Sequence, residues 1–478
     1  MLFNSPEYAV FLLVCLGVYY AVGRARSGLR IQNLFLLGAS YVFYGWWDYR
    51  FLSLIMISTV VDFVAGRIIA GGRASGSRVA MRRGLLVTVV SNLGILGFFK
   101  YFGFFVESAA ALLDAIGLPA TPSVLEILLP IGISFYTFQT LSYSIDIYRG
   151  RLEPVDDFFE FALFVAFFPQ LVAGPIERAR RLLPQIAAPR RPSAVDLYEG
   201  AWLIVLGLFR KVAIADTAAV FVDRAFANPQ EHGSLALSAA LVLYALQIYC
   251  DFAGYSNIAR GSAKLLGFEL IRNFQHPYFS RNPREFWRRW HISLSTWLRD
   301  YLYISLGGNR RGAARTYGAL MLTMLLGGLW HGASWNFVLW GGLHGAYLVI
   351  HRAVEPVLPR LPANAPAILR MSSATVRALG TFALVCGTWL FFRSSDMETT
   401  RHFLAGLVSG GAFDWHLLAP TLILWGCILA IDVPQAITRN EHIFARLPIP
   451  VGAFVASVLI VLTLFAGTPS VPFIYFQF

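Results

Sequence analysis

The stretch Leu235–Tyr255 reads LALSAALVLYALQIYCDFAGY and contains a single charged residue, Asp251. A helix that crosses the ~30 Å hydrocarbon core of a bilayer needs about 20 mostly apolar residues. The composition of the chain agrees, because 57% of its residues are hydrophobic, only 14% are charged and its mean hydropathy is +0.59. A water-soluble domain carries about 25% charged residues. The sequence therefore predicts an all-α membrane protein that crosses the bilayer many times.

Other apolar stretches of similar length are predicted to span the bilayer as well. They are Tyr8–Val22, Ile31–Trp47, Phe51–Ala70, Leu85–Phe105, Val124–Tyr143, Tyr198–Val222, Tyr317–Trp330, Phe337–Ile350, Val376–Phe392, Leu417–Ile431 and Val451–Ala466. The first has no basic segment before it and no small-residue cleavage site, so we expect a helix that is kept rather than a signal peptide.

The loops predict an orientation. Cytoplasmic loops of membrane proteins are rich in Lys and Arg. Arginines follow the first span (Arg24, Arg26, Arg30) and surround the loop after the third (Arg67, Arg73, Arg78, Arg82, Arg83). The loop after the fourth span carries Glu107 and Asp114 and no base. The formal charge of +12 is therefore interpreted first as a sign of membrane topology, because its basic residues lie in loops that are predicted to be cytoplasmic.

The alternation of basic and non-basic loops breaks at the apolar stretch Phe158–Ala173. Arginines flank this apolar stretch on both sides, and Pro169 and Gly174-Pro175 interrupt helices at its end. We expect a re-entrant segment that enters and leaves on the cytoplasmic face. Such a backbone is tolerated only inside protein or beside a wet cavity. The alternative is an amphipathic helix lying on the cytoplasmic surface.

The longest predicted cytoplasmic region, Arg272–Arg315, is strongly basic. Within it, Pro283–Ile304 is predicted to form one helix, because apolar residues recur there at helical spacing. The stripe comprises Phe286, Trp290, Leu294, Trp297, Leu298 and Tyr301. The alternative is an interfacial helix with its arginines at the lipid headgroups.

Three histidines are candidates for chemistry, because ionisable residues at membrane depth are costly. His331 lies among glycines in LLGGLWHG, Leu325–Gly332, where a neutral imidazole could act as a general base. His291 would share a helix face with Trp287 and Ser295. His344, in GGLHG, is a weaker candidate. The alternative for His331 is a histidine hydrogen-bonded to a neighbouring helix. For His291 it is an interfacial histidine among tryptophans, and for His344 it is structural packing.

Other patterns are absent or ambiguous. Asp251 could pair with an arginine of the following region or contact a ligand, and Arg210-Lys211 suggests either snorkelling or contact with an anionic cofactor. The four cysteines have neither metal-ligand nor disulfide spacing, so we expect no metal. No nucleophile elbow, phosphate loop, zinc helix or nucleic-acid module is present, so no nucleic-acid partner is expected.

Several motifs resemble the membrane-bound O-acyltransferase family, in its bacterial alginate O-acetylase branch. They are SYVFYGWW (Ser40–Trp47), FFPQLVAGP (Phe167–Pro175), QIYCDFAGYS (Gln247–Ser256), NFQHPY (Asn273–Tyr278), FWRRWHISLSTWLRDYLYISL (Phe286–Leu306), GGNR (Gly307–Arg310), LLGGLWHG (Leu325–Gly332) and PFIYFQF (Pro472–Phe478). The pair FWRRWHISLS and LLGGLWHG is the most specific. The resemblance implies a ring of about 11–12 transmembrane helices with re-entrant segments around a tunnel.

The resemblance also implies residue roles. The family's near-invariant histidine corresponds to His331 and its second polar position to His291. We expect His331 to be the general base or transfer centre and His291 to orient or polarise the donor carbonyl. Gly327, Gly328 and Gly332 are expected to leave room for the thioester. Other residues expected near the donor tunnel are Trp330, Trp287, Ser295, Asn309, Asp251 and His344.

The expected activity is transfer of an acyl group, most simply acetyl, from a cytoplasmic thioester towards an exported polysaccharide such as alginate. Expected partners are the bilayer of a bacterial inner membrane, acetyl-CoA or an acyl carrier protein as donor, and periplasmic acetyltransferase-like or export proteins; no cofactor is expected to stay bound. We expect one domain, with a core near 124–352 and peripheral helices at 1–123 and 376–478. The alternatives are D-alanyl transfer to teichoic acid, lipid or protein O-acylation, and a transporter without chemistry.

Overall fold

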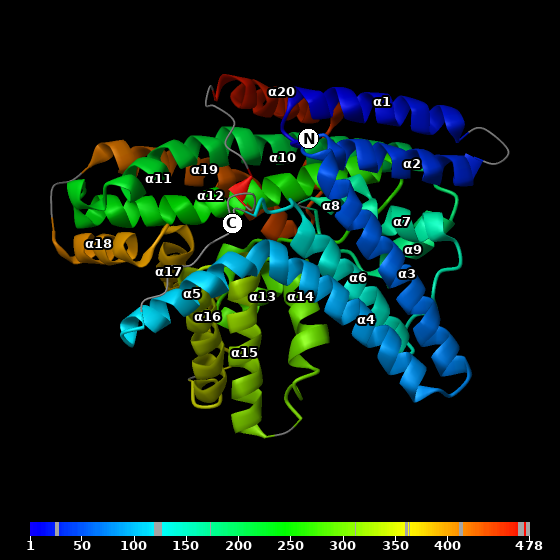
Figure 1. The fold of residues 1–478 in the computed structure, drawn as a ribbon. Coiled ribbons are helices and arrows are strands. Elements are labelled where there is room, and N and C mark those ends of the chain that lie inside the picture. Colours follow the sequence, from blue (N-terminus) through cyan, green and yellow to red (C-terminus); the bar gives the residue numbers. More distant parts are fainter. Residues whose placement is uncertain are drawn as a thin grey trace. The chain divides into compact units, whose positions relative to one another are not determined.

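A computed structural model describes residues 1–23, 28–118, 127–172, 174–310, 312–358, 362, 364–410, 414–466 and 473–474. These residues form helices and connecting loops, and no strand occurs among them (Figure 1). They divide into two compact units, one formed by Met1–Ala201 with Ala259–Ile271 and the other by Trp202–Ile258 with Arg272–Phe478.

Each predicted span overlaps a helix, but the ends differ, and the helix within the predicted span Val124–Tyr143 begins only at Ile133. The helices up to residue 201 are α1 (Pro6–Val22), α2 (Gly28–Gly45), α3 (Leu52–Ala74), α4 (Arg78–Leu96), α5 (Phe102–Ala115), α6 (Ile133–Tyr148), α7 (Phe158–Ala166), α8 (Phe168–Leu171), α9 (Ala179–Ala187) and the start of α10 (Ala194–Leu208). Residues 124–126 of one predicted span lie outside the described part of the chain.

The remaining helices follow in order along the chain. They are η3 (Phe209–Asp216), α11 (Thr217–Ala227), α12 (Ser234–Leu265), α13 (Pro283–Arg289), α14 (Ile292–Trp297), η6 (Leu298–Tyr303), α15 (Ala313–His331), α16 (Trp335–Val354), α17 (Ala367–Arg393), α18 (Met397–Val408), α19 (Trp415–Thr438) and α20 (Ile449–Phe465). Short 3-10 or π turns are η1 (Tyr49–Phe51), η2 (Gly97–Tyr101), η4 (Pro229–Glu231), η5 (Pro277–Phe279) and η7 (Ile443–Arg446).

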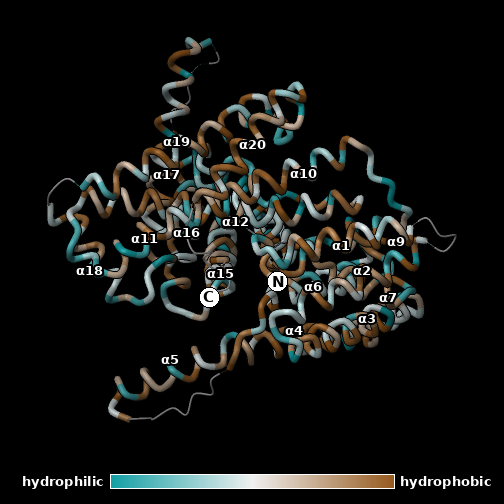
Figure 2. The backbone as a smooth tube through the Cα atoms, turned by 90° about the horizontal axis from the view of Figure 1, so that it is seen from above, coloured by the Kyte–Doolittle hydropathy of each residue, from teal (hydrophilic) through white to brown (hydrophobic). Residues whose placement is uncertain are grey.

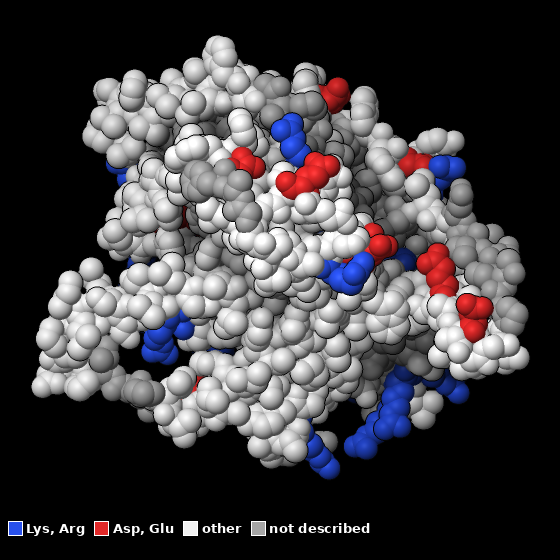
Figure 3. All heavy atoms as spheres, turned by 90° about the vertical axis from the view of Figure 1, so that its left-hand side faces the viewer, with Lys and Arg blue, Asp and Glu red and all other residues white. Residues whose placement is uncertain are grey.

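Five helical stretches are long and apolar enough to cross a bilayer: Tyr49–Ala74, Arg78–Ala115, Ser234–Leu265, Ala367–Arg393 and Trp415–Thr438. Long hydrophobic runs are visible along α3 and α20 in Figure 2. On the face drawn in Figure 3, charged side chains are few and scattered among uncharged ones. Such a surface suits contact with lipid. The chain is therefore an all-α protein with several membrane-spanning helices.

In the first unit, a buried carboxylate ties α3, α4 and α6 together. Asp62 of α3 is fully buried and accepts hydrogen bonds from Thr88, from Asn92 Nδ2 (2.7 Å) and from Ser144 Oγ (3.2 Å). A buried charge or polar group is tolerated only with such partners. These side chains therefore fix the packing of three long helices.

The segment predicted to be re-entrant is a broken helix. After α7 the chain turns at Phe167 (φ −52°, ψ 109°) and continues as the short α8. The Phe164 carbonyl oxygen accepts bonds from Gln139 (2.5 Å) and Gln170 (2.6 Å), and the Phe168 amide donates to Ser40 Oγ (3.1 Å). Nine residues of α7 reach only about 14 Å, less than a bilayer core. Its entry and exit on the cytoplasmic face stay a prediction.

In the second unit, the prediction of one continuous helix over Pro283–Ile304 is wrong. The segment consists of α13, α14 and η6, and the break falls at Trp290 and His291. His291 adopts the left-handed conformation (φ 40°, ψ 56°), which stops a right-handed helix. Apolar spacing continues through the break, so periodicity alone could not reveal it.

The paired bases of this unit are neutralised within the protein. Arg210 Nη2 lies 2.6 Å from Asp432 Oδ1, and Lys211 Nζ lies 2.7 Å from both Asp216 and Asp251. All five side chains are nearly inaccessible to solvent. Neither snorkelling nor contact with an anionic cofactor describes them, because buried bases with carboxylate partners serve the structure.

Candidate active site

The structure brings His291 and His331 together. Their ring centroids are 6.4 Å apart, and their relative exposures are only 0% and 3%. Both belong to the second unit, so their separation is set within one body. Two imidazoles at this spacing can both reach one small group placed between them, at about 3 Å from each.

His331 is the last residue of α15, and the chain turns back immediately into α16 (Figure 1). The Ser334 hydroxyl caps α16 by accepting a bond from the Asn336 amide (3.3 Å). The two helices approach closely, because a Cβ on Gly341 would lie 2.3 Å from the Met324 carbonyl oxygen. Close packing of this hairpin therefore fixes the place of His331.

His291 is positioned by a different device. It sits at the start of α14 in the left-handed region, which non-glycine residues rarely adopt and which carries strain. The side chain is fully enclosed, and this burial lowers the pKa of His291 to about 3. The imidazole is therefore neutral at pH 7 and can donate one hydrogen bond and accept another.

Aromatic rings enclose the two histidines. Phe252 of α12 contacts the His291 ring edge-on at 4.6 Å, and Trp330 lies 5.0 Å from His331 and 5.9 Å from His291. Trp340 and Phe392 contact His331 at 5.0 and 5.3 Å. Sequence analysis pointed to Trp330 but missed the other three, of which Phe252 and Phe392 lie far from both histidines in the chain. These rings form an apolar wall that keeps water away.

The remaining aromatic and polar candidates lie elsewhere. Trp287 and His344 contact each other (5.1 Å) rather than His291, because the helix breaks between Trp287 and His291. Ser295 donates to the Trp290 carbonyl oxygen (3.0 Å), and His344 Nε2 bonds Thr388 Oγ1 (2.9 Å). Asn309 is an exposed turn residue. The expectation that Trp287 and Ser295 flank His291 on one helical face is thus wrong.

The three glycines before and after His331 serve helix packing. A Cβ on Gly328 would lie 2.1 Å from the Phe337 carbonyl oxygen, and one on Gly332 would lie 2.1 Å from the Phe337 ring. On Gly327 it would lie 3.1 Å from Leu298. Protein atoms therefore take the space that Gly328 and Gly332 were expected to leave for a thioester.

Asp251 forms part of the scaffold beside the histidines. It pairs with Lys211 from an earlier helix, not with an arginine of the region that follows it. Its Oδ2 also accepts a bond from the Ile474 amide (2.7 Å), while Phe473 stacks on Tyr255 (4.4 Å). The rest of the PFIYFQF motif lies outside the described residues. Nothing in the sequence pattern had predicted that Asp251 holds this segment.

The basic region around α13 carries two kinds of arginine. Arg281 and Arg289 pair with Glu285, and Arg284 pairs with Glu355. Other members are exposed and have no acidic partner within the described part of the chain; these are Arg288, Arg310 and Arg315. Unpaired guanidinium groups are suited to phosphate.

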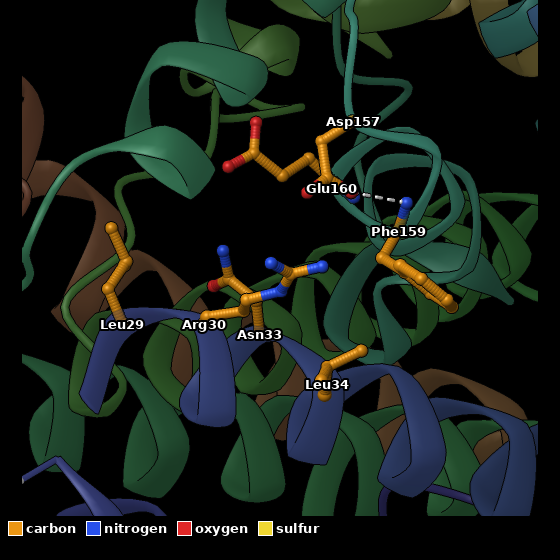
Figure 4. A pocket seen from close by; sticks show the side chains of 7 residues that line it. All are labelled: Leu29, Arg30, Asn33, Leu34, Asp157, Phe159 and Glu160. Atoms are coloured by element: carbon orange, nitrogen blue, oxygen red, sulfur yellow. Dashed lines mark hydrogen bonds between the residues drawn. The ribbon is translucent and has the colours of Figure 1, made fainter. Parts of the chain in front are cut away.

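The first unit contains a separate cavity of about 300 Å³ between α2 and the start of α7 (Figure 4). Arg30 and Asn33 face Asp157 and Glu160 across it, and Asp157 also caps α7 through the Phe159 amide (2.7 Å). No histidine lines it. Across the described residues, no group of His, Cys, Asp or Glu side chains could hold a metal ion.

Comparison with known proteins identifies the family. The profile of the MBOAT, membrane-bound O-acyltransferase family, matches residues 155–384, which include both histidines. A protein named "Probable alginate O-acetylase AlgI" from Azotobacter vinelandii is 44% identical over 419 residues, covering 87% of this chain and 79% of that protein. The chain belongs to the MBOAT family. It is an O-acyltransferase of the AlgI-like branch, so the alternative of a transporter without chemistry is discarded.

Two further relatives are named for other activities. The peptidoglycan O-acetyltransferase of Helicobacter pylori is 34% identical over 437 residues and matches 85% of this MBOAT chain and 80% of its own length. The teichoic acid D-alanyltransferase of Streptococcus thermophilus is 32% identical over 248 residues, covering only 49% of this chain and 58% of that protein. Similarity to the O-acetylases thus extends over far more of the chain.

Proposed function

We propose that this protein moves an acetyl group from a cytoplasmic thioester across the membrane for O-acetylation of an exported polysaccharide such as alginate. The pairing of His291 with His331, 6.4 Å apart inside an aromatic enclosure, is the observation that carries the proposal. The O-acetylase relatives match 85–87% of the chain and support acetyl as the acyl group. One relative is named for alginate and the other for peptidoglycan, which supports a polysaccharide acceptor.

The proposed reaction assigns one step to each histidine. His331 accepts the proton of the attacking hydroxyl while its oxygen bonds to the thioester carbonyl carbon. His291 donates a ring N–H to the carbonyl oxygen, where negative charge develops. The carbon–sulfur bond then breaks, and the thiolate leaves as the carbonyl reforms. The apolar wall strengthens these interactions and limits hydrolysis of the thioester.

The donor is proposed to approach through the basic region. Coenzyme A and a phosphopantetheine carrier both carry phosphate groups, at the opposite end of the pantetheine arm from the thioester. The exposed arginines Arg288, Arg310 and Arg315 are suited to such a donor. Arg288→Glu should therefore raise the KM for the donor several-fold and leave kcat within twofold, whereas an unchanged KM would remove Arg288 from the donor site.

The proposed setting is a bacterial inner membrane, with acceptor or partner on the periplasmic side. The chain either esterifies the sugar itself or passes the acetyl group to a periplasmic partner that does so. D-alanyl transfer from a carrier protein is the second candidate, and the partial match to a D-alanyltransferase supports it.

The deciding experiment uses membrane vesicles with this protein, its export partners and labelled acetyl-CoA. Label should enter polymer or partner with the intact chain and should be lost with His331→Ala at equal protein level. His416→Ala, which changes an exposed histidine at the start of α19, is the matched control and should keep full activity. Equal label from His331→Ala would refute the catalytic role. Label only from a D-alanyl-loaded carrier would establish the second candidate.

A further inference from the structure

The break that places His291 is held from outside its own helix. The segment Asn273–His276 runs alongside it and supplies two backbone bonds. The Ile292 amide donates to the Asn273 carbonyl oxygen (2.9 Å), and the Gln275 amide donates to the Arg289 carbonyl oxygen (3.0 Å). Between these bonds, Trp290 and His291 lie opposite the single residue Phe274. Backbone hydrogen bonds thus tie the chain to this segment on both sides of the turn at Trp290 and His291.

The side chain of Asn273 joins this segment to two helices. Its Oδ1 accepts a bond from Ser293 Oγ of α14 (2.6 Å), and its Nδ2 donates to Ser256 Oγ of α12 (2.9 Å). Asn273, Ser256 and Ser293 each have a relative exposure of 1–2%. Both ends of the amide are thus used, and they link the residues next to His291 to a long, regular helix.

The far end of the segment lies beside a buried ion pair. His276 also has a left-handed backbone (φ 48°), and its Nδ1 lies 3.7 Å from Asp432 Oδ2. The Asp432 carboxylate is in turn held by Arg210 (2.6 Å) and by the Tyr249 hydroxyl (2.7 Å). A strained conformation persists only where its surroundings over-determine it. The backbone bonds of Asn273 and Gln275 and the two side-chain bonds of Asn273 meet that requirement for His291.

We propose that Asn273 is a positioning residue for acyl transfer, which holds His291 at its working distance from His331 by bridging Ser256 and Ser293. This inference rests on the proposed role of His291. Among the described residues, Asn273 forms no hydrogen bond with either histidine; it acts through the backbone of Ile292 and the side chain of Ser293. A displacement of about 1 Å at a reacting group can cost ~10²-fold in rate.

Asn273→Ala should lower kcat by ~10- to 100-fold while the KM for the acyl donor stays within twofold. Ser293→Ala and Ser256→Ala each remove one end of the bridge and should give smaller losses of kcat. The matched control is Asn33→Ala in the other unit. That buried amide also bridges two partners, Arg190 and the Ile186 carbonyl, so its loss tests stability alone.

The proposal would be overturned if the activity of Asn273→Ala fell only in proportion to the amount of folded protein, as is expected for Asn33→Ala. A kcat within twofold of that of the intact chain would overturn it as well. If Asn273→Ala does not fold, the kcat and KM of the two serine variants decide in the same way. His291→Ala is measured alongside. Full activity in His291→Ala would refute the proposed role of His291, whereas an inactive His291→Ala beside a fully active Asn273→Ala would refute this inference alone.

Discussion

The two histidines of this acyltransferase are carried by elements of opposite character. His331 ends α15, a regular helix packed glycine to glycine against α16. His291 sits on a strained turn between two short helices, held by buried polar bonds from Asn273 and Gln275. The packing of α15 against α16 tolerates no added atoms, whereas the turn at His291 tolerates no lost hydrogen bond. Each histidine should therefore be sensitive to a different class of substitution.

The largest effect should come from the histidines themselves. Because the two rings are proposed to act on one bound thioester, His291→Ala and His331→Ala should each lower acyl transfer by ~10²- to 10⁴-fold. Groups that act as a unit give non-additive losses. The double variant should therefore be little worse than the poorer single variant in the vesicle assay. If the loss of activity in the double variant equals the product of the two single losses, the histidines serve separate steps. The different ways in which α15 and the turn at His291 hold them would then not bear on one shared reaction.

The next effect tests the packing of α15 against α16. A Cβ on Gly341 meets the Met324 carbonyl oxygen at 2.3 Å, so Gly341→Ala should cost roughly 1–3 kcal/mol of stability and displace His331. Its neighbour provides the control, since a Cβ on Gly342 meets only Leu325 Cδ2 at 3.5 Å. Gly342→Ala should be neutral or stabilising by about 0.5–1 kcal/mol. Thermal unfolding in detergent measures both, and equal effects would contradict the packing argument.

The sequence was sufficient for the elements whose signal is local. An apolar run such as Leu235–Tyr255 forms a helix because every backbone N–H and C=O group in lipid must be hydrogen-bonded within the segment. The observed α12 contains this run. The break at His291 could not be foreseen, because its hydrogen bonds come from Asn273 and Gln275, outside the periodic segment. Motif resemblance nevertheless selected His331 and His291, and the structure places their rings near each other.

The roles of the other candidate residues depend on which neighbours they face, and this cannot be read from the sequence. Gly328 and Gly332 were expected to face a substrate, yet they face Phe337. The partner of Asp251 is Lys211, which precedes it by a whole helix. In both cases the residue type indicated that the position is constrained. A buried charge costs free energy unless it has a partner, and a glycine in a helix usually marks a close approach. Only the fold decides which neighbour imposes that constraint.

The smallest effect concerns His344, which lies behind the wall of His331. Its Nε2 bonds Thr388 Oγ1 (2.9 Å), and its ring contacts Trp340 at 4.8 Å. Thr388→Val leaves a buried nitrogen unpaired, which should cost about 1–3 kcal/mol in stability. Activity per folded molecule should change less than threefold, because His344 acts only through packing. Thr388→Ser keeps the hydroxyl and should behave like the intact chain. A hundredfold loss of activity in Thr388→Val with the fold intact would place His344 in the chemistry, and the site would then depend on a third histidine held by hydrogen bonding.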